Sequence, residues 1–236
     1  RHTMLIAVNA GNSRVLLGGY EEDGQVFSAS IATEPKLTRD DYACKLQQVL
    51  LLYGVNVRRI HGGIVSSVVP SMVGVLEGAL RLLGIRDVIE VSSGVKTGLN
   101  IRSDQPQQVG ADRVAAAVAA KARGSLPCVV VDCGCATTFT VLDENGALVA
   151  SAITAGVELS LEALRAQTAQ LPTVALVRGA KYDVMARNTA DAMRVGAVMG
   201  AAAMVDGLIG RYAAVLGKTP RVWLTGDCCQ LIAPHL

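Results

Sequence analysis

Residues 4–13 read MLIAVNAGNS, a short apolar run that ends in a glycine-containing turn. Residues 128–137 read CVVVDCGCAT and repeat this arrangement. Asn9 matches Asp132 and Gly11 matches Gly134, so each pair lies 123 residues apart (132 minus 9 and 134 minus 11). Because this offset is about half of the 236 residues, the sequence predicts a duplicated lobe.

Each glycine turn is followed by two further strand-like runs. In the first half, residues 14–20 and 26–32 flank an Asp-Gly dipeptide at 23–24. In the second half, residues 138–142 and a run that reaches Ile153 flank an Asn-Gly dipeptide at 145–146. Asp-Gly and Asn-Gly between apolar runs are strong hairpin signals. We therefore expect each lobe to open with a three-stranded meander.

The rest of each half alternates helical and strand-like patterns. Apolar residues at helical spacing predict helices over 38–54, 71–83, 107–123 and 188–216, and short apolar runs predict strands over 60–65, 87–91 and 221–224. Strands that alternate with helices are typical of an α/β fold. The predicted lobes are residues 4–118 and 119–236, with a cleft between them.

Composition excludes several classes of protein. Hydrophobic residues make up 51% of the chain and charged residues 18%, and the net charge of +2 is not gathered into a basic block, so nucleic acid is not an expected partner. The sequence contains no run of about 18 uncharged apolar residues, and no membrane span is expected. The six cysteines form no Cys-x-x-Cys pair, and this pattern favours a reducing, cytoplasmic location.

A glycine turn at the end of a strand suits an anion, because backbone N–H groups can approach it without a Cβ in the way. The side chains of Asn12, Ser13, Thr137 and Thr138 add further donors. One such turn is usually a simple hairpin, but two at matched positions favour a phosphate site. The sequence holds neither a Gly-x4-Gly-Lys-Ser/Thr motif nor a Gly-x-Gly-x-x-Gly motif.

Gly110-Ala111-Asp112-Arg113 places an acid and a base at the start of a predicted helix. Phosphoryl transfer to a hydroxyl group needs a carboxylate near the acceptor and positive charge near the phosphates. The spacing alone also fits a charge pair on the solvated face of a helix start. The catalytic and the structural interpretations both stay open at this point.

At these residues the chain closely resembles the type III pantothenate kinases, in the superfamily of sugar kinases, heat-shock ATPases and actin. The resemblance runs from Met4 over nearly the whole chain. Its markers are residues 9–13, 66–70 (Ser-Ser-Val-Val-Pro), 94–99, 110–113, 132–139, 159–164, 187–189 and 225–226. It implies two ribonuclease H-like (actin-like ATPase) lobes with an interlobe cleft.

The resemblance also implies ATP-dependent phosphorylation of pantothenate in coenzyme A biosynthesis, with Mg²⁺ and a monovalent cation (K⁺ or NH₄⁺), in a cytoplasmic homodimer. Asp112 is the implied general base and Asp132 the implied ligand of the monovalent cation. The implied pantothenate contacts are Gly110, Ala111, Asp112, Arg113 and Thr189. The implied ATP contacts are Asn9, Ala10, Gly11, Asn12, Ser13, Arg14, Val15, Leu16, Gly134, Cys135 and Thr137.

Several positions depart from the family pattern, among them Arg14, Ala116, Ala155 and Asp227, and three bear most directly on the chemistry. Asn9 stands where the family has Asp, Cys135 where it has Thr, and Ser103 where it has Tyr. An amide supplies no negative charge for a metal, and a thiol is a weak hydrogen-bond donor. These changes predict a slow enzyme or one that needs a paralogous partner in a hetero-oligomer. The alternatives are a non-catalytic regulatory protein resembling the Bvg accessory factors, and a kinase for another small hydroxylated acceptor.

Overall fold

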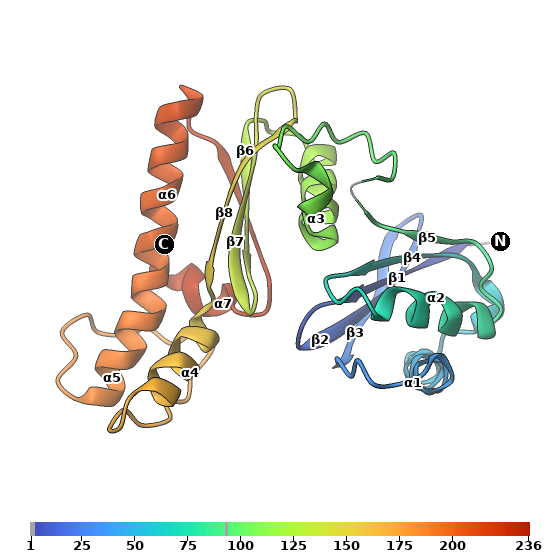
Figure 1. The fold of residues 1–236 in the computed structure, drawn as a ribbon, viewed down its shortest axis with the longest axis horizontal. Coiled ribbons are helices and arrows are strands. Elements are labelled where there is room, and N and C mark those ends of the chain that lie inside the picture. Colours follow the sequence, from blue (N-terminus) through green and yellow to red (C-terminus); the bar gives the residue numbers. More distant parts are fainter. Residues whose placement is uncertain (1–2, 93) are drawn as a thin grey trace. The chain divides into compact units, whose positions relative to one another are not determined.

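The computed structural model describes residues 3–92 and 94–236, which divide into two compact units. The first unit comprises the described residues of Arg1–Thr97 together with Gln105–Ala115, and the second comprises Gly98–Asp104 and Ala116–Leu236. Both units combine one sheet with helices (Figure 1). The lobe limits and the cleft expected from the sequence stay predictions.

The first unit is built on a five-stranded sheet with the order β3-β2-β1-β4-β5. Its strands are β1 Met4–Ala10, β2 Arg14–Glu21, β3 Gly24–Ala32, β4 Ile60–Ser67 and β5 Val88–Glu90. β1, β2 and β3 form the predicted antiparallel meander, and β4 and β5 lie parallel to β1. The meander predicted from the Gly11 turn and the Asp-Gly hairpin is therefore confirmed.

One face of this sheet carries the core of the first unit. Alternate residues of β1, from Met4 to Ala10, are buried against helices α1 Arg39–Leu52 and α2 Met72–Leu82. Thr38 begins α1 with a capping box, since its hydroxyl accepts from the N–H of Asp41 and its own N–H donates to the Asp41 carboxylate. Because side chains alternate along a strand, Asn9 lies on the opposite face from this core.

The second unit repeats the arrangement with a four-stranded sheet of order β8-β7-β6-β9. Its strands are β6 Cys128–Cys133, β7 Ala136–Leu142, β8 Leu148–Ala155 and β9 Arg221–Thr225. β6, β7 and β8 form an antiparallel meander, and β9 pairs with β6 in parallel. In both units, then, the first strand of a meander has a parallel neighbour on its other side, as the duplication predicts.

Helices complete the second unit. Its core joins β6 and β7 to α4 Val157–Gln167, α6 Gly200–Leu216 and α7 Cys229–Ile232. α5 Thr189–Arg194, a π-helical turn Val195–Met199 and α6 form one continuous helix that ends at Gly217. This helix is long and apolar enough to cross a membrane, with 22% of its most apolar window buried. That is weak evidence for a membrane span, because core helices of soluble proteins meet the same criterion.

The helix predictions need correction at the start of the third helix and by the addition of two helices. The third helix does not start at Gln107: Pro106–Gln108 forms a 3-10 turn, and α3 covers only Ala111–Ala122. The extended backbone of Val109 separates the two, and the carbonyl of Gly110 accepts the first helical bond from Val114 at 3.0 Å. The sequence patterns also missed α4 and α7.

The buried Tyr42 of α1 offers a test of the first unit's packing. Its hydroxyl accepts from the N–H of Glu34 at 2.9 Å and donates to the Glu34 carbonyl at 3.3 Å. Tyr42→Phe keeps the ring but leaves the N–H of Glu34 unpaired, while the Glu34 carbonyl still accepts from the N–H of Leu37 at 3.1 Å. We expect a loss of about 1–2 kcal/mol of unfolding free energy. The control is Tyr20→Phe, at a side chain that is 41% exposed. Equal urea midpoints for the two variants would contradict this role.

Candidate functional site

The first glycine turn connects β1 to β2 and is held by a hydrogen bond within the turn and by hydrogen bonds from Thr33. The N–H of Gly11 donates to the carbonyl of Arg14 at 2.9 Å, which closes the turn. Thr33, just after β3, donates its hydroxyl to the carbonyl of Gly11 at 2.8 Å and its N–H to that of Ser13 at 3.0 Å. The sequence analysis missed Thr33, because only the pairing of β2 with β3 brings it to the turn.

This turn lies at the carboxyl end of β1, beside the carboxyl end of the parallel strand β4. The N–H of Val68 donates to the carbonyl of Ala10 at 3.0 Å and keeps the two strand ends together. The chain leaves β1 toward β2 on one side, whereas β4 and β5 lie on the other. Such a switch point at the carboxyl ends of parallel strands is where open α/β sheets bind ligands.

The predicted ATP contacts of residues 9–16 fall into two groups. Ala10 and Val15 are fully buried in the core and can offer a ligand only backbone atoms. The side chains of Asn12, Ser13, Arg14 and Leu16 are exposed. Asn9 is half-buried, and its Oδ1 atom lacks a hydrogen-bond partner within the described part of the chain. The exposed amide and hydroxyl of the turn are therefore the donors available to an anion.

The second glycine turn, between β6 and β7, is one residue shorter. The N–H of Gly134 donates to the carbonyl of Ala136 at 3.2 Å, and the carbonyl of Cys135 accepts from the N–H of Gly156 at 2.9 Å. Gly156 follows β8 and touches the turn so closely that a Cβ would lie 2.2 Å from the carbonyl oxygen of Gly134. The Cys135 side chain is left exposed.

Asp132 lies near the end of β6 with a half-buried carboxylate. The adjacent backbone of Gly226, at φ +93°, is so close that a Cβ there would lie 2.4 Å from Asp132 Oδ1. Any residue other than glycine at position 226 would clash with this carboxylate. Burial raises the pKa of the neighbouring Cys133 thiol to about 12, with smaller effects from Cys229, Asp132 and Cys228, so Cys133 adds no charge beside it.

The strand register decides which hydroxyl groups share a face with Asp132. Thr138 pairs with Asp132 on β7 and Thr225 pairs with it on β9, so all three lie in one row across the sheet. Thr137 lies on the opposite face, with 1% of its surface exposed. The register therefore places Thr138, and not Thr137, beside the predicted cation ligand.

Gly110 to Arg113 belong to the first unit and form the start of α3. Asp112 Oδ1 accepts from the N–H of Arg113 at 2.8 Å, and no described residue bonds to the second oxygen. A Cβ on Gly110 would lie 2.6 Å from Asp112 Oδ1. Burial lowers the pKa of the Arg113 guanidinium, and the charge of Asp112 opposes this effect. The pair thus presents one free carboxylate oxygen at a helix N-terminus.

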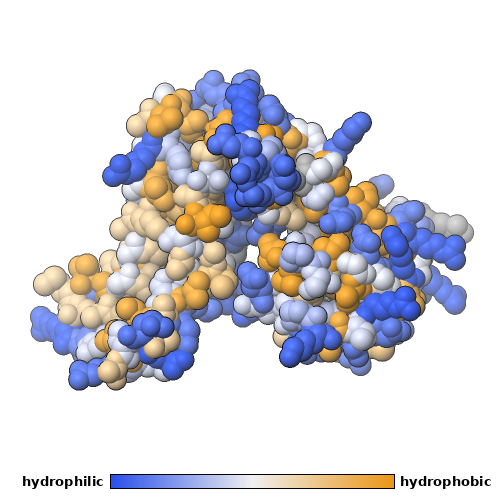
Figure 2. Space-filling view, viewed as in Figure 1, coloured by the Kyte–Doolittle hydropathy of each residue, from blue (hydrophilic) through white to orange (hydrophobic). Residues whose placement is uncertain are grey.

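Thr189 lies in the second unit, in a groove of about 780 Å³ between α4 and the long helix. Apolar and small side chains such as Leu164, Met193 and Ala197 line most of the groove. Figure 2 shows pale orange, alanine-rich surface over α5 and α6. Of the predicted pantothenate contacts, only Thr189 lies in this unit, because Gly110 to Arg113 lie in the first.

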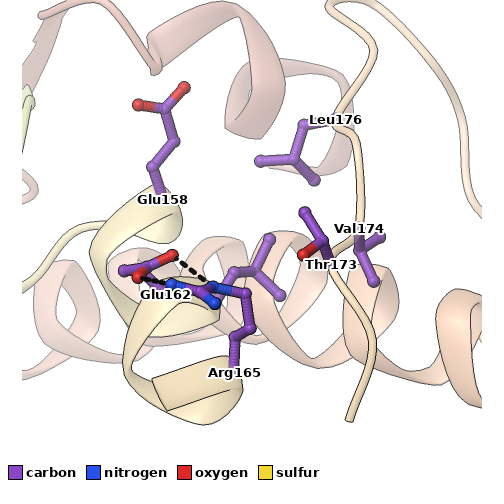
Figure 3. A pocket seen from close by; sticks show the side chains of 7 residues that line it. Glu158, Glu162, Arg165, Thr173, Val174 and Leu176 are labelled. Atoms are coloured by element: carbon purple, nitrogen blue, oxygen red, sulfur yellow. Dashed lines mark hydrogen bonds and ion pairs between the residues drawn. The ribbon is translucent and has the colours of Figure 1, made fainter.

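A smaller pocket of about 270 Å³ lies beside α4, between this helix and residues 173–176. In Figure 3 the charged groups of Glu162 and Arg165 lie against each other and form an ion pair, whereas the carboxylate of Glu158 lies away from them. Because Arg165 is already paired, we assign no ligand to this pocket.

Among the described residues, no three His, Cys, Asp or Glu side chains gather as a metal site. In a kinase, Mg²⁺ is usually held by one or two protein oxygens and by the phosphates of its nucleotide. Asn9 offers a buried, unpartnered amide oxygen and Asp132 a carboxylate. The donors present are hard oxygen atoms and fit hard cations.

The family described as type III pantothenate kinase matches residues 5–211. A type III pantothenate kinase of Geobacter sulfurreducens is 36% identical over 233 residues, covering 98% of this chain and 90% of the relative. This similarity extends over both units and over every marker segment named above.

Solved structures agree on the fold. A conserved Baf family protein of Campylobacter jejuni is 17% identical with a TM-score of 0.54, covering 98% of this chain and 87% of that one. Component A of (R)-2-hydroxyglutaryl-CoA dehydratase from Acidaminococcus fermentans is 12% identical with a TM-score of 0.55, covering 97% and 85%. These likenesses confirm the predicted fold class, an α/β fold of the actin-like ATPase type.

The family match and the relative confirm the sequence-based assignment of function to a kinase that transfers a phosphoryl group from ATP. The chain belongs to the type III pantothenate kinase family, the phosphotransferases that serve coenzyme A biosynthesis.

Proposed function

We propose that this chain phosphorylates the hydroxyl group of pantothenate at a reduced rate, with Asp112 as general base. The observation that carries this proposal is the start of α3, where Asp112 keeps one carboxylate oxygen free while Arg113 is partly buried beside it. A carboxylate with a free oxygen can take the proton of an acceptor alcohol. The guanidinium supplies positive charge of the kind that phosphoryl transfer requires.

The two glycine turns are the proposed phosphate contacts. In the first unit, the exposed Asn12 and Ser13 and the turn that Thr33 holds would receive phosphate oxygens. In the second unit, Gly134 and Thr138 take this role, and Cys135 contributes its backbone more than its weakly donating thiol. Of the two threonines named as donors from the sequence, we retain Thr138, because it shares the face of Asp132.

Mg²⁺ and a monovalent cation, K⁺ or NH₄⁺, are the proposed metal cofactors. Mg²⁺ neutralises charge on the transferring phosphoryl group when it is bound. The Asn9 amide oxygen would face the Mg²⁺ ion from the protein, and the Asp132 carboxylate would hold the monovalent cation. Because Asn9 lacks the charge of a carboxylate, we expect this chain to position the divalent cation poorly.

The apolar groove and the exposed small residues of the long helix favour a homodimer that buries this surface. Exposed apolar surface is typical of protein–protein contacts, and a second copy of the chain could bury it. The groove holds Thr189, so a second copy seated there would lie beside a predicted pantothenate contact. A paralogue with Asp at position 9 could take the same place in a hetero-oligomer. The proposed compartment is the cytoplasm, because all six cysteines are free thiols.

The departures at Asn9, Cys135 and Ser103 favour a second candidate, a regulatory protein that binds nucleotide without turnover. The fold is shared with a solved Baf family protein. The two candidates differ in one measurement, the release of ADP from ATP with Mg²⁺ and K⁺ in the presence and absence of pantothenate. Release that pantothenate does not increase, even beside a co-expressed paralogue, would contradict pantothenate kinase activity and favour the regulatory candidate.

Asp112→Asn keeps the size of the side chain but removes the base. We expect pantothenate-dependent ADP release to fall by about 10²–10⁴-fold while ATP binding is retained. The matched control is Glu144→Gln, which removes a carboxylate from the exposed hairpin turn between β7 and β8. Similar rates for the Asp112 variant and the control would exclude Asp112 as the base.

Asn9→Asp restores the missing negative charge on the face opposite the core. If metal positioning limits this chain, turnover should rise by a factor of about ten or more, a part of the roughly 10²–10³-fold effect of a lost electrostatic contact. The comparison is Asn12→Asp, which adds the same charge in the exposed turn. An unchanged turnover in Asn9→Asp would place the limit at another step.

A further inference from the structure

Two buried oxygen atoms of the first unit lack a protein partner and lie on neighbouring strands. Asn9 Oδ1 on β1 and Ser66 Oγ on β4 each expose less than 1 Å² and make no hydrogen bond within the described part of the chain. Ser66 as a whole is 6% exposed. A buried polar group without a partner is costly, so native proteins pair such groups with protein, water or an ion.

The strand register brings these two atoms to one place. Asn9 pairs with Ser66 in the parallel ladder of β1 and β4, one residue after the core pair Val8 and Val65. Both side chains therefore lie on the face opposite the core, at the carboxyl ends of their strands. This is the switch point beside the first glycine turn.

The second unit has the same pair of positions. Asp132 of β6 pairs with Thr225 of β9, as Asn9 of β1 pairs with Ser66 of β4. Each unit thus sets an acid or its amide beside a hydroxyl group, at the end of two parallel strands.

The chemistry of the first pair selects its ligand. Asn9 Oδ1 only accepts hydrogen bonds and would repel a phosphate oxygen, whereas the hydroxyl of Ser66 can donate or accept. A water molecule satisfies both, since it can donate to Asn9 and either accept from Ser66 or donate to it. Mg²⁺ gives up its water ligands reluctantly and usually keeps several of them in proteins.

We propose that Ser66 is a positioning residue which, together with Asn9, holds a water molecule of the divalent cation's hydration shell. This inference rests on the proposed use of Mg²⁺ with ATP at this turn. Ser66 compensates in part for the missing carboxylate at position 9, because it gives the metal-bound water a second fixed partner.

The neighbouring serine is a matched control. Ser67 donates its hydroxyl to the carbonyl of Val69 at 2.8 Å and accepts from the N–H of the same residue at 3.0 Å. Its hydroxyl is therefore already used by the fold. Ser67→Ala should lower the unfolding temperature of the ligand-free chain, whereas Ser66→Ala should leave it unchanged or raise it, because it removes an unpaired group.

The experiment titrates Mg²⁺ against the full chain with a non-hydrolysable ATP analogue and follows binding by calorimetry. We expect Ser66→Ala to raise the Mg²⁺ concentration for half-maximal binding by about fivefold, the effect of one neutral hydrogen bond. Ser66→Thr keeps the hydroxyl group that Thr225 provides in the second unit and should stay close to the unaltered chain. Ser67→Ala should leave the Mg²⁺ dependence unchanged.

Two results with the variants would overturn the proposal. One is an unchanged Mg²⁺ dependence in Ser66→Ala, and the other is an equal shift in Ser66→Ala and Ser66→Thr. Absence of Mg²⁺-dependent binding in the unaltered chain would also overturn it. ADP release with pantothenate is measured separately. A chain that binds the analogue as expected but does not respond to pantothenate would contradict the proposed kinase activity and leave the role of Ser66 standing.

Discussion

The parallel pairing of the first meander strand with a later strand is the constraint on which both units depend. In the first unit β1 pairs with β4, and in the second β6 pairs with β9. The pairing leaves a glycine turn at the carboxyl end of the central strand, next to a second strand end. Backbone N–H groups, a strand-terminal amide or acid, and a hydroxyl group meet there without any dedicated loop. Each unit therefore presents the same set of groups at one strand end as a consequence of its topology.

The duplicated turns do not carry the same charge. The strand-terminal side chain is neutral in the first unit and ionisable in the second, where Gly226 makes room for the carboxylate of Asp132. An anionic ligand needs cations on its phosphates, and a carboxylate holds a cation more strongly than an amide does. In the proposed function, the carboxylate of Asp132 would therefore hold its cation more strongly than the amide of Asn9 would.

Sequence reasoning reached most of the strands because their signals are local. The Asp-Gly and Asn-Gly hairpins, the capping box at Thr38 and the apolar runs each act over a few residues, and the structure confirms them. The start of α3 was placed too early, because the pattern of Gln107 and Gln108 fits a helix while the extended Val109 interrupts it. Thr33 and Ser66 were not assigned to the site, and Thr137 and Thr138 were not told apart, since only strand pairing decides which of two successive residues faces a turn.

The residues that set the fold and those that set the chemistry alternate along the same strands. Val8 and Ala10 are buried in the core, and Asn9 between them points the other way. A change from Asp to Asn at position 9 removes one charge and leaves the packing of its neighbours as it was. The same holds for Cys135, whose side chain is exposed in its turn. Sequence similarity over the whole chain therefore reflects largely the residues of the core face, and it establishes the family. In the proposed mechanism, the rate of the reaction depends on a few side chains of the other face, such as that of Asn9. The core face can therefore keep the architecture of the family while a residue on the other face changes.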